Sequence, residues 1–308
     1  MTTLRVTQRS IAQHTLAGLQ TNIGRLGEIQ QRLSSGKEIS KPSDSPTGTV
    51  SAMQLRSEIR SNEQWSRNAD DGIGWLGTMD QTLGSSLNSL QKIRGLTLQA
   101  LNSGASSPES DQARAVEVVQ LREGLIGLAN TTYLDRPVFG GTTNGRRAYD
   151  STGTYVGNPQ QPVPPATALP VIPVTRTVGA GAEVRVDQTG PEVYGPAGAD
   201  LFTVLASITQ HMKDGNTAAL TSDLTDLDTA MSRMQGKLAE VGAGYNRVEQ
   251  MQQAADDRVL TLKSSLSGIE DIDLPRTIVE LQMQQVAYQA ALGATAKIIT
   301  PSLADFLR

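Results

Sequence analysis

The side chains that most often carry chemistry in proteins are scarce in this sequence. It has no cysteine and two histidines, His14 and His211, among 308 residues. The lack of cysteine excludes disulfides, thiolate nucleophiles, iron-sulfur clusters and cysteine-ligated zinc. Each histidine stands outside any spaced ligand cluster such as His-x-x-x-His, so we expect both to be surface or packing residues.

A Gly-x-Gly-x-x-Gly pattern occurs at Gly72, Gly74 and Gly77. In a dinucleotide-binding fold this pattern follows a strand and opens a helix, because the glycines let the backbone approach a pyrophosphate. Here it lies inside a helical run of apolar residues, and no β-prone run precedes it. We therefore expect glycines in a helix interior, where they permit close packing of helices.

The carboxylates and serines form no catalytic set either. Acidic pairs such as Asp70-Asp71 and Asp256-Asp257 fall on helix faces or ends, where solvation or capping explains them. The sequence has no Gly-x-Ser-x-Gly elbow and no ordered Ser, His and Asp set. It thus predicts no catalytic residue, no cofactor and no metal site, and a protein that is not an enzyme.

The charge balance also argues against two classes of partner. Lysine and arginine number 27 against 31 aspartates and glutamates, for a formal net charge of −4. We therefore expect no nucleic acid partner, and no membrane insertion because no apolar stretch is long enough to span a bilayer. The first ten residues lack the apolar core of a secretory signal, so a cleaved signal peptide is not expected.

Aromatic residues make up only 4% of the chain. Aromatic side chains supply much of the buried area of compact interiors, and 308 residues would ordinarily form about two domains. The shortage of aromatic residues therefore favours an elongated or assembly-dependent protein.

Composition divides the chain into three parts. Residues up to about 130 and from about 200 onward have a helical texture, whereas residues 137–199 mix prolines and glycines with short β-prone runs. The first helix is expected to end at Ser35-Gly36, and Ser45 with Pro46 to begin the second. The predicted fold is mainly α, an elongated helical coiled-coil rod formed by N- and C-terminal arms, with a small β-rich inserted domain.

The clearest periodicity runs from Leu220 to Ile269, where apolar residues alternate at spacings of four and three. This is the 3.5-residue repeat of a coiled coil. An unbroken helix of that length would reach roughly 75 Å. Gly236, Gly242 and Gly244 are weak points within it, at which some bending is expected.

Both ends of the chain carry a similar narrow apolar repeat. Prolines separate each repeat from the rest, at Pro42 and Pro46 on one side and at Pro275 on the other. A two-residue-per-heptad seam buries too little apolar surface to fold alone, so we expect these helices to need partners. The alternative is that they pack only within their own chain. The predicted assembly seam consists of Leu16, Leu19, Ile23, Leu26, Leu33, Ile278, Leu281, Tyr288, Leu292 and Ile299.

These patterns predict three regions. Residues 1–41 and 276–308 form a terminal coiled-coil assembly domain. Residues 42–136 and 200–275 form the helical rod domain, and residues 137–199 form a β-rich outer insert.

Two segments of the N-terminal arm resemble the signature of the flagellin superfamily. They are residues 33–39 followed by 42–46, and residues 68–76, which resemble the next helix of that superfamily. Ser45 departs from the signature, in which Asp is common. The resemblance covers both arms, whereas the insert matches nothing specific.

Three further features resemble the hook-associated branch of this superfamily rather than its filament subunits. They are residues 128–131 running through Tyr133 to 138–141, the closing helix 280–298, and the short ending 302–307. The resemblance implies a tubular wall of paired terminal helices, a helical rod outside it and an outer β-rich domain. It further implies export through the flagellar type III channel with the help of an export chaperone, and an extracellular location.

The implied role is a structural adaptor in the bacterial flagellum. Its implied partners are hook-associated protein 1, flagellin and further copies of the same chain in a ring. Three alternatives remain open at this point: flagellin itself, a generic coiled-coil adaptor, and an enzyme whose site would lie in residues 137–199.

Overall fold

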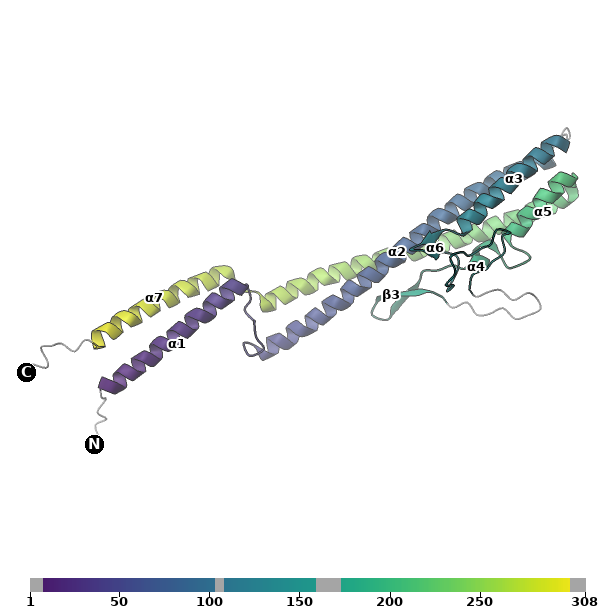
Figure 1. Cartoon of the computed structure of the whole chain (residues 1–308). Helices are drawn as coiled ribbons and strands as arrows, with labels where there is room; N and C mark the ends of the chain where they lie inside the picture. The colour runs from purple at the N-terminus through teal and green to yellow at the C-terminus, as the bar shows by residue number, and fades with distance from the viewer. Residues whose placement is uncertain (1–7, 103–107, 159–172, 300–308) are drawn as a thin grey trace, which may run out of the picture. The chain divides into compact units, whose positions relative to one another are not determined.

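The computed structural model describes residues 8–102, 108–158 and 173–299, with side chains from residue 13 to residue 296 within these ranges. Helices dominate, so the prediction of a mainly α fold is confirmed. The helices are α1 (Gln8–Ser35), α2 (Pro46–Leu101), α3 (Pro108–Ala129), α4 (Gly190–Tyr194), α5 (Leu201–Asp214), α6 (Thr217–Glu270) and α7 (Leu274–Ile299) (Figure 1).

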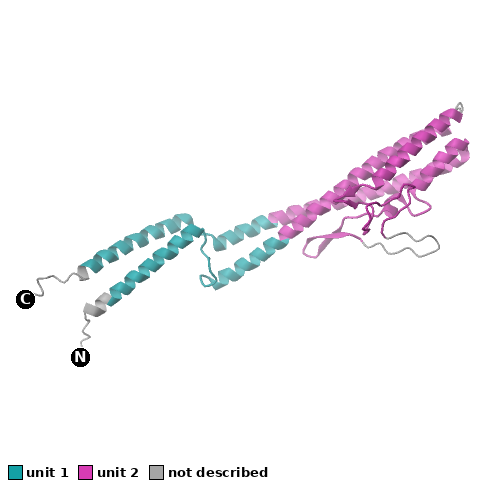
Figure 2. Ribbon diagram, viewed as in Figure 1, with its two compact units in different colours: residues 1–61, 258–308 teal, residues 62–257 magenta. Residues whose placement is uncertain are grey.

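The chain divides into two compact units, and both contain residues from the N-terminal and the C-terminal arms (Figure 2). Unit 1 comprises residues 1–61 and 258–308, and unit 2 comprises residues 62–257. The long helices α2 and α6 each begin or end in unit 1 and continue into unit 2.

The expected helix boundaries at the first break are confirmed. Gly36 ends α1 with φ of +71°, and its amide donates to the Arg32 carbonyl over 2.9 Å. Glycine is favoured there because it carries no Cβ penalty in the left-handed region. At the start of α2 the Ser45 hydroxyl accepts from the Gly48 amide over 3.1 Å, and Pro46 fills the first helical position.

The long C-terminal repeat forms one helix, as its periodicity predicts. α6 runs without interruption through Gly236, Gly242 and Gly244. Its seam is buried in unit 2, for example at Leu227 and Met234. In unit 1 the same seam continues at Val259 and Leu262, which pack with Ile59 of α2, and Leu55 and Leu266 flank this cluster.

Unit 2 adds α3 and α5, which pack against each other, and two small antiparallel hairpins. The first pairs β1 (Thr132–Tyr133) with β2 (Arg136–Pro137), and the second pairs β3 (Thr175–Gly179) with β4 (Ala182–Arg185). Within the described part of the insert, regular β structure is therefore one hairpin of short strands, and irregular chain surrounds it.

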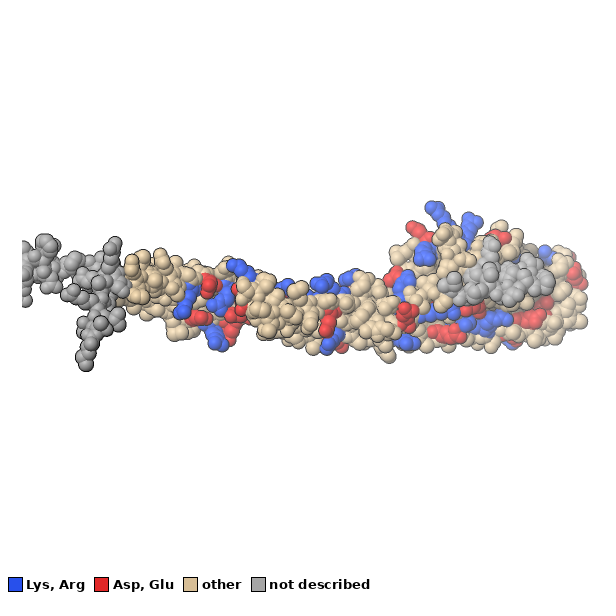
Figure 3. Space-filling model, turned by 90° about the horizontal axis from the view of Figure 1, so that it is seen from below, with Lys and Arg blue, Asp and Glu red and all other residues tan. Residues whose placement is uncertain are grey.

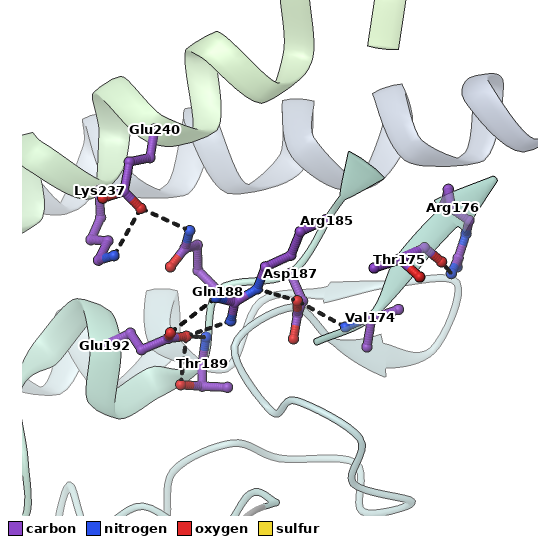
Figure 4. Close-up of polar contacts among 10 residues, drawn as sticks. All are labelled: Val174, Thr175, Arg176, Arg185, Asp187, Gln188, Thr189, Glu192, Lys237 and Glu240. Carbon is purple, nitrogen blue, oxygen red and sulfur yellow. Dashed lines mark hydrogen bonds and ion pairs between the residues drawn. The ribbon is translucent and has the colours of Figure 1, made fainter. Parts of the chain in front are cut away.

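A polar network holds the second hairpin to α4 and α6 (Figure 4). Arg185 donates to Asp187 over 2.8 Å and to both oxygens of Glu192, at 3.1 and 2.7 Å. Gln188 reaches Glu240 of α6 over 3.2 Å. These bonds connect residues 185–192 to a helix of the C-terminal arm.

Burial raises the pKa of Glu192, but hydrogen bonds from Arg185 and Thr189 more than offset it, so the pKa of Glu192 lies below its usual value. The insert also contains an aromatic cluster of Phe139, Tyr149 and Tyr194, which meets Phe202 of α5 at ring distances near 5 Å. This cluster belongs to the same hydrophobic core as the helices of unit 2.

Candidate assembly surface

The terminal helices α1 and α7 lie side by side in unit 1 (Figure 1). On α1 the half-buried side chains facing this contact include Leu19, Leu26 and Leu33, with Ile29 only 3% exposed. They recur at spacings that keep one ridge of the helix against its neighbour.

The matching face of α7 is more polar than that of α1. Thr277 is buried, and Leu281, Gln284 and Tyr288 are half-buried. The Gln284 amide donates to the Asn22 side chain over 3.3 Å and approaches the Asn22 carbonyl at 3.4 Å. An amide pair such as Asn22 and Gln284, at the centre of a narrow seam, fixes the register of the two helices. It does so at a cost in buried apolar surface.

The structure divides the predicted assembly seam between two surfaces. Leu19, Leu26, Leu33, Leu281 and Tyr288 lie at the contact between α1 and α7. The remaining residues with described side chains are exposed: Leu16 (59%), Ile23 (48%), Ile278 (43%) and Leu292 (43%). Ile299 ends α7, and its side chain lies outside the described part of the chain.

The reason for this division is geometric. Each residue of a helix advances about 100°, slightly more than a quarter turn. Leu16 and Ile23 therefore lie on the ridge next to the one that carries the contact residues. A two-helix pair covers only one ridge of each helix, so the neighbouring ridge remains open.

A second apolar stripe on α7 escaped the sequence analysis. Val279, Met283 and Val286 are 54%, 64% and 65% exposed, and Ala290 continues their spacing of four and three. These positions lie roughly 160–240° around the helix from Thr277, on the side that faces away from α1. The alternation was visible in the sequence, but the stronger set through Leu281 and Leu292 obscured it.

A long stretch of each terminal helix, between Arg9 and Arg25 in α1 and between Glu280 and Lys297 in α7, also lacks charge. Residues 10–24 and 281–296 contain no Asp, Glu, Lys or Arg. On the face shown in Figure 3, the surface beside the grey terminal atoms is correspondingly free of blue and red. Solvated helix faces usually carry charged residues, so exposed apolar stripes without charge are unusual for a surface in contact with water.

A groove of about 700 Å³ adjoins the inner end of α1, between that helix, residues 38–45 and the start of α2. Asp44 accepts from the Lys41 and Ser40 amides over 2.8 and 3.1 Å, and these bonds lower the pKa of its carboxyl. A Cβ at Gly48 would lie 2.5 Å from Cδ1 of Ile39, so a larger residue there would displace the end of that side chain. These contacts shape the connector after α1, and they arrange no reactive group.

The residues whose side chains could take part in chemistry lie elsewhere, and they do not come together in one site. Gly74 lies in α2 directly beneath the ring of Tyr133, as expected for a close-packing glycine. His14 is exposed, and His211 contacts Asp223 at 2.6 Å. Among the described residues no group of three or more His, Cys, Asp or Glu side chains is arranged to hold a metal ion. No helix in the same ranges is both long and apolar enough to cross a membrane.

Comparison with known proteins identifies both arms. The bacterial flagellin N-terminal helical region matches residues 6–139, and the bacterial flagellin C-terminal helical region matches residues 224–307. Together these two matches span most of the chain and leave the middle part between them.

Relatives extend over almost the whole length. The chain is 26% identical to a flagellin of Bacillus subtilis, with 96% of each chain covered. It is 24% identical to flagellar hook-associated protein 3 of Escherichia coli, covering 94% of this chain and 96% of that protein. Its fold is similar to that of the flagellar junction protein FlgL from Legionella pneumophila, with a TM-score of 0.56 and 14% identity over 71% of this chain and 99% of the solved one.

Proposed function

Since the chain belongs to the bacterial flagellin family, we propose that it is the structural adaptor that joins the flagellar hook to the filament. The proposal rests on the uncharged residues 10–24 of α1 and 281–296 of α7, where exposed apolar stripes remain beside the contact between the two helices. Burial of such stripes in a wall of neighbouring subunits offsets the entropy of ordering the terminal helices.

The junction role is supported by two comparisons and by one feature of the sequence. Hook-associated protein 3 of Escherichia coli aligns over nearly its whole length, and the solved junction protein FlgL shares the fold. The entry to the insert points the same way, because residues 138–141 resemble the hook-associated branch of the superfamily. The filament subunit is the second candidate, supported by the flagellin of Bacillus subtilis.

The proposed partners follow from this position. Hook-associated protein 1 lies on the hook side, flagellin on the filament side and further copies of this chain complete a ring. We also propose an extracellular location, reached through the flagellar type III channel with an export chaperone.

Substitution of the far face of α7 tests the role of the assembly surface. In the double variant Met283→Asp/Val286→Asp both new carboxylates stay solvated in the monomer, so its helical circular dichroism and melting should hold within about 3 °C. In the wall the same carboxylates would be buried without partners, which costs several kcal/mol, so filaments should fail to attach. Electron microscopy and the amount of shed flagellin measure this outcome.

Val116→Asp is the matched control, because Val116 is 58% exposed on α3 outside the terminal helices. It should leave attachment intact. Normal filaments with the α7 variant would refute the assembly surface, as would attachment failure caused by the control. Immunogold labelling separates the two roles, since a junction protein labels one band beyond the hook and a filament subunit labels along the filament.

A further inference from the structure

The two breaks that separate the terminal helices from α2 and α6 lie against each other in unit 1. Lys37, after α1, forms an antiparallel bridge with Asp271, after α6. The Glu38 amide donates to the Glu270 carbonyl over 2.6 Å, and the Ile272 amide donates to the Gly36 carbonyl over 3.1 Å. Residues more than 230 positions apart in sequence are thus joined by backbone hydrogen bonds.

One buried carboxylate lies at this crossing. Glu270 is the last residue of α6, and its side chain is only 5% exposed. One of its oxygens accepts from Lys37 over 2.8 Å and from Arg56 of α2 over 2.7 Å. Burial of the carboxyl raises its pKa, but the bonds from Lys37 and Arg56 outweigh this, and the pKa lies below its usual value.

The two cations differ from the carboxylate in exposure. The side chains of Lys37 and Arg56 are 43% and 48% exposed, so water can solvate them if the carboxylate is removed. Glutamate is rarely buried unless it is paired, and a buried pair adds little net stability compared with apolar packing. In some proteins such a pair instead fixes a defined arrangement of the segments it connects.

We propose that Glu270 joins the two breaks into a single conformational joint, which holds the connectors after α1 and α6 to each other and to α2. We name residues 36–38, Arg56 and residues 270–272 the Glu270 joint. With the carboxylate in place, the two connectors are held together. The helices α1 and α7 therefore keep one register relative to each other where they join α2 and α6. Without it, each terminal helix is attached through its own glycine- or proline-containing connector.

Hydrogen exchange on the full chain tests the joint. Glu270→Gln keeps the size of the side chain and removes its charge. Exchange at the Glu38 and Ile272 amides should become about tenfold faster or more, as expected when a buried ion pair loses one partner. Amides of α2 and α6 beside Ile59 and Leu262 should keep their rates, because the apolar cluster there does not include Glu270.

The control is Glu58→Gln, which removes an exposed 3.3 Å contact with Arg258 in the same unit. It should leave the Glu38 and Ile272 amides unchanged. The joint is refuted if Glu270→Gln leaves these amides protected. It is also refuted if exchange accelerates equally throughout unit 1, since Glu270 would then be an ordinary contributor to stability.

A cross-link provides the rescue. The chain contains no cysteine, so Lys37→Cys and Asp271→Cys introduce its only thiols, at two positions that already face each other. In the Glu270→Gln background the oxidised form should recover slow exchange at Ile272, and reduction should abolish the recovery. Failure of the disulfide to form, or fast exchange in its presence, contradicts the proposal.

Discussion

Gly74 shows how a single residue can carry the pattern of one function and serve another. Its place in Gly-x-Gly-x-x-Gly suggests phosphate binding, yet it lies inside α2 where the Tyr133 ring approaches the backbone. Tyr133 in turn contacts the Trp75 ring edge-on at 5.8 Å. The absence of a side chain at this glycine therefore lets the first hairpin pack closely against α2.

Gly74→Ala should consequently destabilise unit 2. The added Cβ would overlap the Tyr133 side chain, and overpacking of this kind costs about 1–3 kcal/mol. Gly84→Ala in the same helix has nothing within 4 Å of its Cβ and should stabilise by up to about 1 kcal/mol. Urea unfolding of both variants measures the contrast, and equal effects would show that Tyr133 moves freely.

Glu192 makes the stability of the insert sensitive to acid. Its pKa is lowered in the folded state, so the carboxylate stabilises the fold fully above its ordinary pKa and this contribution is lost as pH falls through the lower folded value. The free-energy difference between wild type and Glu192→Gln should therefore be largest near neutral pH and shrink below about pH 4.5. Urea midpoints measured from pH 7 to pH 3 would show this, and a difference independent of pH would contradict it.

At the scale of elements, helices were more predictable than the faces they present. The repeat between Leu220 and Ile269 predicts α6, and every position of this seam is buried or half-buried in the structure. The helix caps at Gly36 and Ser45 likewise depend on residues that are neighbours in sequence, and they were predicted correctly. Local propensity and periodicity decide these features without reference to distant residues.

The terminal helices show where this reasoning ends. A periodicity identifies a ridge, but which of two adjacent ridges faces the partner depends on the partner. The sequence pattern groups Leu16 and Ile23 with Leu19 and Leu26, and it does not single out the stripe through Met283. The Glu270 joint was also beyond reach, because its members are contributed by three separate segments of the chain.

At the scale of the whole molecule, the few aromatic residues are distributed unevenly. The described aromatic residues are concentrated in and beneath the insert, where Phe139, Tyr149, Tyr194 and Phe202 share one cluster. The long helices rely instead on aliphatic seams. The sequence contains few aromatic residues for two compact cores. It could not show that the irregular chain of the insert would contain so many of them.

The construction of unit 1 from both ends of the chain has a kinetic consequence. Its contacts connect residues as far apart as Asn22 and Gln284, which are separated by 262 positions. The entropy of closing such a loop must be met before any of these contacts forms, unless α2 and α6 have already been brought together. Unit 2 contains element pairs that lie closer together in sequence, such as the β3–β4 hairpin and α3 with α5. We therefore expect unit 2 to fold first, and pulse-labelled hydrogen exchange during refolding should find its amides protected before those of α1. In a chain that emerges N-terminus first, α1 then lacks its partner until α7, which follows all the other helices described, has also emerged.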